Sequence, residues 1–285
     1  MPADDFMTVV ELYDRAIKTR DNLEFAESVE LFKQALRIMA HVETVLPFRI
    51  AFAYDMALAR DLSGDSAGAK QLFELAVELY EEFRHSEPNH DAVNGFSGLM
   101  WGVNDYLSLV NNADMQADNY LDSITPRRWA AEKLPLKVYV DSSPATGFDT
   151  TLAETIFDAF HAWTQNQTFL RWEKTTSPDQ AMITVTRVAD GLDSAGGHTA
   201  FEETSDGIGN VQLQSANIRI SMHSPDSSAY KPAELRAFKS LTIHEVGHAL
   251  GVDGHSPHAS DLMYWKSPLL ELSDRDVRTL KLMYS

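Results

Sequence analysis

The sequence predicts an α+β protein in two parts, an all-helical module over residues 1–124 followed by a mixed domain over residues 125–285. The first part has helical periodicity throughout and echoes itself at an interval of 41 residues, which is typical of stacked helical repeats. The second part alternates strand patterns with amphipathic helices. The helical pattern ends at Thr125-Pro126, and 285 residues are enough for two hydrophobic cores.

In the helical module, residues 41 positions apart have similar sizes: small residues match small ones and large residues match large ones. Helices that cross closely need small residues at the crossing and large residues beside it. The matching pairs are Ala16 with Ala57, Leu31 with Leu72, Phe32 with Phe73, and Ala35 with Ala76. The second copy, residues 51–83, resembles a tetratricopeptide repeat, whose period is about 34 residues. We assign the additional length to a long connection over residues 42–50, which contains Pro47.

A third helix pair is expected over residues 91–110 and 113–123, as the cap that such stacks require. Its large apolar residues are expected in the core; they are Phe96, Leu99, Trp101 and Tyr106.

Charge is concentrated in the same module. The chain has a formal net charge of −18, and residues 1–124 hold 22 acidic and 9 basic residues. This acidity favours a solvated outer face, with a groove for a basic peptide as the alternative. It argues against nucleic acid and anionic membranes as partners, because both would repel the chain. Repeat stacks offer concave surfaces, so the module is expected to bind a protein partner or substrate.

The mixed domain begins with a strand over residues 135–141 and a helix over 148–167, the latter opened by a Thr151-x-x-Glu154 capping box. Further strands are expected over residues 182–188, 197–203 and 217–223. Pro232 is suited to open a helix over residues 232–250, and a last helix starts after Ser273.

The residues that carry chemistry lie at the end of the 232–250 helix. His244 and His248 are one turn apart, so both imidazoles can reach one Zn²⁺ ion. Glu245 lies beside them, where its carboxylate can act as general base toward a metal-activated water. Gly251 can adopt the left-handed conformation that ends a helix, which lets His255 return as a third ligand.

The run HEVGHALGVDGHS, residues 244–256, with the later Asp261-Leu262-Met263-Tyr264, resembles the metzincin zinc endopeptidases and most closely the matrixins. The resemblance implies a twisted, mostly parallel sheet with an active-site helix and a C-terminal helix. It implies zinc ligands at His244, His248 and His255, Glu245 as catalytic base, and Met263 in the turn beneath the metal.

The same resemblance implies that a peptide substrate lies antiparallel along an edge strand containing Gly197, His198, Thr199, Ala200 and Phe201. It also implies that the selectivity pocket is walled by residues after the methionine turn. Tyr264 and Asp261 are the candidates for that pocket or for support of the ligands.

The sequence departs from the matrixin pattern at the third ligand. Gly254 stands where the family has its third histidine, and His255 comes one residue later. A glycine bulge would accommodate the insertion, and Asp253 and His258 are the alternative ligands. His198 and His223 are expected as ordinary strand or loop residues, with a second metal site as the alternative.

Acidic residues in loops near glycines could form a calcium site, although such loops are more often simply solvated. The candidate residues are Asp190, Asp193 and Asp206.

These features predict a zinc endopeptidase whose helical repeats dock a substrate or partner, with a weakly catalytic zinc-binding adaptor as the alternative. The chain has no cysteine, so disulfides and a thiolate metal site are excluded. No apolar run approaches the roughly 20 residues of a membrane span. The N-terminal residues lack the pattern of a signal peptide, so a cytoplasmic location is expected, with leaderless secretion or a longer precursor as alternatives.

Overall fold

The computed structural model describes the chain except residues 1–2, 43, 144, 166, 190–195 and 206–210. Its contacts divide the chain into two compact units, Met1–Asn112 and Ala113–Ser285. Residues 113–124, which the sequence groups with the helical module, therefore pack with the second unit. Within the described residues, no helix is both long enough and apolar enough to cross a membrane.

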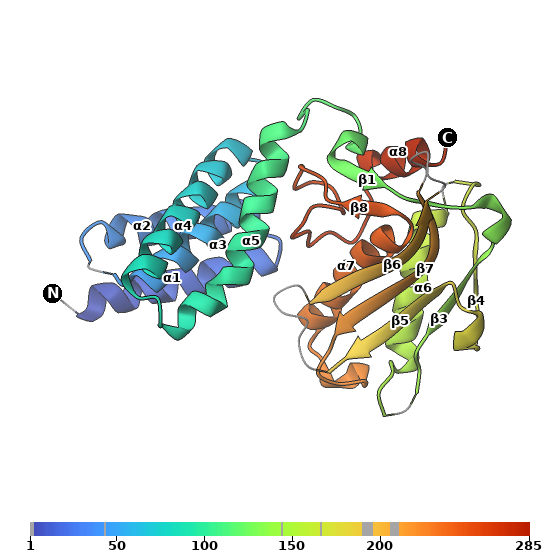
Figure 1. Cartoon of the computed structure of the whole chain (residues 1–285). Helices are drawn as coiled ribbons and strands as arrows, with labels where there is room; N and C mark the ends of the chain where they lie inside the picture. Colours follow the sequence, from blue (N-terminus) through green and yellow to red (C-terminus); the bar gives the residue numbers. More distant parts are fainter. Residues whose placement is uncertain (1–2, 43, 144, 166, 190–195, 206–210) are drawn as a thin grey trace. The chain divides into compact units, whose positions relative to one another are not determined.

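The first unit consists of helices, shown in blue to green in Figure 1. They are α1 (Ala3–Asp21), α2 (Phe25–Met39), α3 (Leu46–Leu62), α4 (Ser66–Ser86) and α5 (Asp91–Asn112). Helix α1 packs mainly on α2, and α3 packs mainly on α4. Between α3 and α4, Gly64 adopts a φ of +93° and the Asp65 side chain accepts the Gly68 amide at 3.0 Å, so this turn has both a left-handed glycine and an N-cap.

The residues of the 41-residue echo occupy equivalent places in these two helical hairpins. Ala16 of α1 and Ala57 of α3 are fully buried, as are Phe32 of α2 and Phe73 of α4. The connection between the hairpins is shorter than expected, because Pro47 lies in the first turn of α3 and residues 46–50 are already helical.

The last helix pair differs from the expectation. Helix α5 forms, but residues 113–123 contain only a short 3₁₀ helix, η1 (Leu121–Ser123), in place of a second helix. Trp101 was expected in the core and is 73% exposed. The buried stripe of α5 follows Val93, Met100, Val103 and Leu107 at helical spacing, and position 101 lies off that stripe.

The second unit is built on a mostly parallel sheet, as predicted, in the order β2-β7-β5-β3-β4, with β6 pairing antiparallel with β7. Its strands are β2 (Arg128–Trp129), β3 (Leu136–Val140), β4 (Trp172–Lys174), β5 (Ile183–Val188), β6 (Gly197–Ser205) and β7 (Val211–Ser221). A separate antiparallel pair joins β1 (Ile124–Pro126) to β8 (Val252–Gly254). The remaining 3₁₀ turns are η2 (Ala131–Lys133), η3 (Pro178–Gln180) and η4 (Ser227–Ala229).

Three helices complete this unit: α6 (Thr150–Thr164), α7 (Pro232–Ala249) and α8 (Asp274–Met283). Helices α6 and α7 pack against each other, and α7 also contacts β6 and β7. The N-cap of α6 is Asp149, which accepts the Leu152 amide at 2.8 Å, so the expected capping box at Thr151 does not form. A capping box of Ser273 and Asp276 opens α8, which begins after Ser273 as expected.

Candidate metal centre

Helix α7 presents His244, Glu245 and His248 near its C-terminal end. The chain reverses after the helix at Gly251, which has a φ of +107° and whose added Cβ would collide with the Arg127 carbonyl. Only glycine fits there without strain. Trp129 Nε1 donates to the Ala249 carbonyl at 2.9 Å, which fixes the end of the helix against the sheet.

Three imidazoles converge at this place. Nitrogen atoms of His244, His248 and His255 all lie within 4.8 Å of one another, and the Nε2 atoms of His244 and His248 are 3.1 Å apart. His255 reaches the cluster because Gly254 before it has a φ of +128°. The inserted residue is thus accommodated at a glycine in the left-handed region.

The rings are oriented by main-chain carbonyls. The Nδ1 atom of His244 lies 3.0 Å from the Leu262 carbonyl, and that of His248 lies 2.6 Å from the Val252 carbonyl. A carbonyl can only accept, so each Nδ1 carries the proton and each Nε2 keeps a lone pair for a metal. Three imidazole nitrogens fit the protein donor set of a catalytic zinc ion.

Electrostatics favour the neutral form of two of these imidazoles, those of His244 and His255. Burial, followed by the neighbouring His248, lowers the pKa of His244 to about 3. The pKa of His255 is also lowered, chiefly by burial and then by the other two histidines. The positive charge of Lys266 also lowers the pKa values of His244 and His255. Burial lowers the pKa of Lys266 itself. At neutral pH a metal would therefore meet deprotonated rings at His244 and His255.

Glu245 is held beside the histidines by the edge strand β6. Its side chain is buried, and Thr199 donates from Oγ1 to Glu245 Oε2 at 2.6 Å. A Cβ added to Gly197 would lie 2.6 Å from Glu245 Oε1, so the glycine permits this close approach. The strand thus limits where the carboxylate can lie.

The two alternative third ligands lie outside the histidine cluster. Asp253 accepts from Arg127 Nε at 2.9 Å and Nη2 at 2.7 Å, and Arg127 also pairs with Glu203 of β6. In the described part of the chain, the three histidines are the one group of three or more His, Cys, Asp or Glu that could share a metal, and it contains neither Asp253 nor His258.

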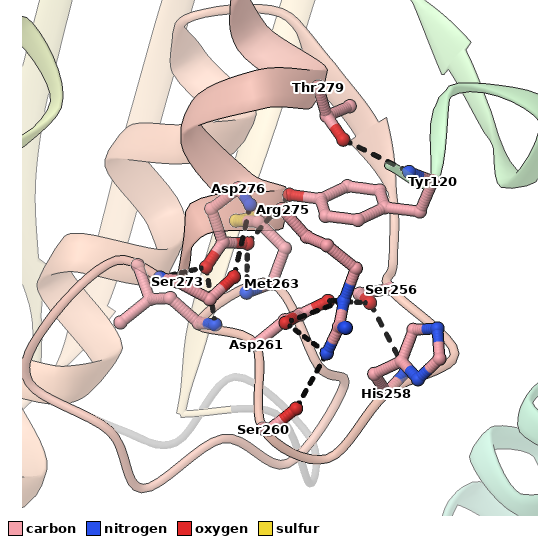
Figure 2. A network of polar contacts seen from close by, with 11 residues as sticks. Tyr120, Ser256, His258, Ser260, Asp261, Met263, Ser273, Arg275, Asp276 and Thr279 are labelled. Atoms are coloured by element: carbon pink, nitrogen blue, oxygen red, sulfur yellow. Dashed lines mark hydrogen bonds and ion pairs between the residues drawn. The ribbon is translucent and has the colours of Figure 1, made fainter. Parts of the chain in front are cut away.

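Met263 lies in a turn that follows the histidine cluster in the sequence, and its side chain packs against α7. It is fully buried, and a Cβ added to Gly247 of α7 would lie 2.5 Å from its sulfur. Tyr264 is also fully buried. Asp261, fully buried as well, accepts from Ser256 Oγ at 2.6 Å and from Arg275, so it braces the loop that follows the ligands (Figure 2).

The strand that was expected to bind substrate corresponds to β6. Gly197 and Thr199 face the buried side toward α7, whereas His198 and Ala200 are exposed and Phe201 is half-buried. Among the described strands, β6 pairs with β7 alone.

The other metal expectations find no support in the described residues. His223 packs its ring on Tyr230, and neither it nor His198 joins a metal-capable group of three. The candidate calcium ligands Asp190, Asp193 and Asp206 lie outside the described residues.

Sequence reasoning missed several residues that shape the site. They include Arg127, Asp276 and Tyr120, none of which carries a sequence pattern that marks a residue of the site. The roles of Arg127 and Tyr120 depend on partners more than 100 residues away, for which the chain carries no local signal. A fully buried carboxylate such as Asp276 is detectable only once burial is known.

Comparison with protein-family models matches residues 128–285 to the model described as Matrixin. The chain belongs to the matrixin family. Matrixins are zinc-dependent metalloproteases, and the histidine cluster described above lies within the matched residues and could hold a metal ion. The match begins just after β1 and includes every strand of the main sheet. A comparison with curated proteins found no match.

Proposed function

We propose that this matrixin is a zinc endopeptidase in which His244, His248 and His255 hold the metal and Glu245 is the general base. The observation that carries the proposal is the convergence of three imidazoles beside a buried carboxylate that is held by the strand β6. Zinc held by such a donor set supplies a Lewis acid that lowers the pKa of water and polarises a carbonyl.

In this proposal the protein side chains perform the proton transfers. Glu245 takes a proton from the attacking water and delivers it to the leaving amine, so no covalent intermediate is required. Its hydrogen bond from Thr199 and the contact with Gly197 hold the carboxylate in one position during both transfers. A peptide extended along β6 would bring its scissile bond past this carboxylate.

The test combines metal analysis of the purified full chain with digestion of an unstructured peptide library, with and without chelator. Glu245→Gln should retain one zinc per chain and lose roughly two to four orders of magnitude in rate. A protein that binds zinc without cleaving any peptide would instead support the adaptor function. Undiminished turnover in Glu245→Gln would refute the assignment of the base.

We further propose that the helical unit, Met1–Asn112, binds a substrate protein or partner. Two features support this role: its 19 acidic against 9 basic residues, and the exposed indole of Trp101. A fragment of residues 113–285 should cleave short peptides as the full chain does, but should show a higher KM for docked protein substrates. If adding residues 1–112 in trans inhibits peptide cleavage, the unit is an inhibitor and docking must be abandoned.

A further inference from the structure

The first turn of α8 places a buried carboxylate under the methionine turn. Asp276 is fully buried and accepts hydrogen bonds from the Leu262 amide at 2.8 Å and the Met263 amide at 3.3 Å. It also accepts the Ser273 amide at 2.8 Å and the hydroxyl of Tyr120 at 2.7 Å (Figure 2). The backbone of the methionine turn is therefore held by one side chain.

Asp276 depends on these neutral donors. No ion pair of Asp276 with a lysine, arginine or histidine is found within the described residues, and the adjacent Arg275 pairs instead with Asp261. A buried carboxylate is stable only where donors replace water, so each of the four hydrogen bonds matters. Tyr120 supplies the one that comes from a side chain.

Tyr120 is itself fixed in place on α8. Its side chain is 2% exposed, and its backbone amide donates to Thr279 Oγ1 at 3.0 Å, one turn after Asp276. Two residues earlier, Asp118 forms an ion pair with Arg278. The segment of residues 113–123, which leads from the helical unit into β1, is thus attached along α8 through Asp118 and through the amide and hydroxyl of Tyr120.

A short path connects Tyr120 to the histidine cluster. The amide of Leu262 donates to Asp276, and the carbonyl of Leu262 accepts from Nδ1 of His244 at 3.0 Å. The same residue therefore joins the carboxylate to the imidazole. If Asp276 shifts, the carbonyl that orients the His244 ring shifts with it, and groups that orient metal ligands influence metal affinity.

We propose that Tyr120 is a positioning residue of the metal centre, acting through Asp276 and Leu262 on His244. It follows that the catalytic unit begins near Ala113, and that residues 113–123 help to position the metal centre. This inference rests on the proposed zinc function. In this proposal the two parts of Tyr120 have different roles. The hydroxyl orients Asp276, and the ring packs in the core.

The test uses the full chain with Tyr120→Phe, which keeps the ring and removes the hydroxyl. Tyr139→Phe is the matched control, because Tyr139 is half-buried and lies in β3, which β7 and β5 separate from β6 in the sheet. Zinc affinity is measured by competition with a chelator, and amide hydrogen exchange is followed at Leu262 and Met263. Tyr120→Phe should weaken zinc binding roughly tenfold and speed exchange at both amides, with the control unchanged.

A purely structural role predicts a different pattern. If Tyr120→Phe lowers the unfolding midpoint but leaves zinc affinity and the two amides as in the wild type, the inference is wrong. Coupling gives a second check, since Tyr120→Phe and Asp276→Asn should be non-additive on zinc affinity if they act on one path. Additive effects would overturn the proposal.

Two further outcomes distinguish a failure of the proposed zinc function from a failure of the proposed role of Tyr120. If the wild-type chain binds no zinc, the proposed function fails, while the amide exchange still reports whether Tyr120 holds the methionine turn. If Tyr120→Phe does not fold, Thr279→Val removes only the acceptor for the Tyr120 amide and is measured in the same way. Wild-type zinc affinity and wild-type amide exchange in that variant would count against the inference.

Discussion

The contact between Gly197 and Glu245 gives the sharpest test of how the sheet controls the chemistry. An alanine at position 197 would place its Cβ 2.6 Å from Oε1, 2.8 Å from Cγ and 2.9 Å from Cδ of Glu245. Ordinary carbon contacts are about 3.5–4 Å, so the glutamate must move by roughly 1 Å. The movement would also disturb the 2.6 Å hydrogen bond from Thr199.

A displacement of about 1 Å in a catalytic group can lower a rate about 100-fold. Gly197→Ala should therefore reduce kcat/KM by about two orders of magnitude, close to the effect of removing the base. Zinc content should not change, because the added methyl group meets Glu245 and not a histidine. The assay is hydrolysis of a quenched fluorescent peptide, with metal analysis on the same samples.

Gly95→Ala is the control for the substitution itself. Its Cβ would meet nothing within 4 Å in helix α5, so it should leave activity unchanged and stabilise the helix by up to about 1 kcal/mol. If Gly197→Ala keeps zinc and full activity, the strand does not hold the carboxylate. If it loses zinc, β6 supports the metal cluster and not only the base.

Three further predictions concern the same unit. Gly247→Ala should lower the free energy of unfolding by about 1–3 kcal/mol, because its Cβ would lie 2.5 Å from the Met263 sulfur; urea unfolding checks this, and an unchanged midpoint would contradict it. Asp253→Ala should retain zinc, whereas His255→Ala should lose most of it in dialysis against a chelator; the reverse result would make the aspartate the third ligand. In the metal-free protein, the pKa of His244 is about 3 against a usual value of about 6.5, so below pH 6.5 the unfolded chain binds a proton that the folded chain excludes. Stability should thus fall as pH decreases from about 6.5 towards 3, by up to about 1.4 kcal/mol per pH unit from this residue, and urea titrations in chelator should show a shallower fall in His244→Gln.

The sequence predicted the site most successfully where the signal is local. Helical periodicity places His244 and His248 one turn apart, and the glycine after the helix requires a left-handed turn, so both features follow from spacing alone. The mostly parallel sheet was also expected, and the structure confirms the α+β class. The prediction of a second helix over residues 113–123 was wrong. These residues pack on α8, and a short isolated helix has little stability of its own.

What the sequence by itself determined is the kind of chemistry: the ligand types, their spacing on α7 and the return of the chain through a glycine-assisted turn. Tertiary structure alone decided how the carboxylates are held. Thr199 meets Glu245 across 46 residues, and Tyr120 meets Asp276 across 156. Periodicity reports which face of an element is buried, but it carries no information on which distant element covers that face. The partners of both carboxylates are therefore properties of the fold.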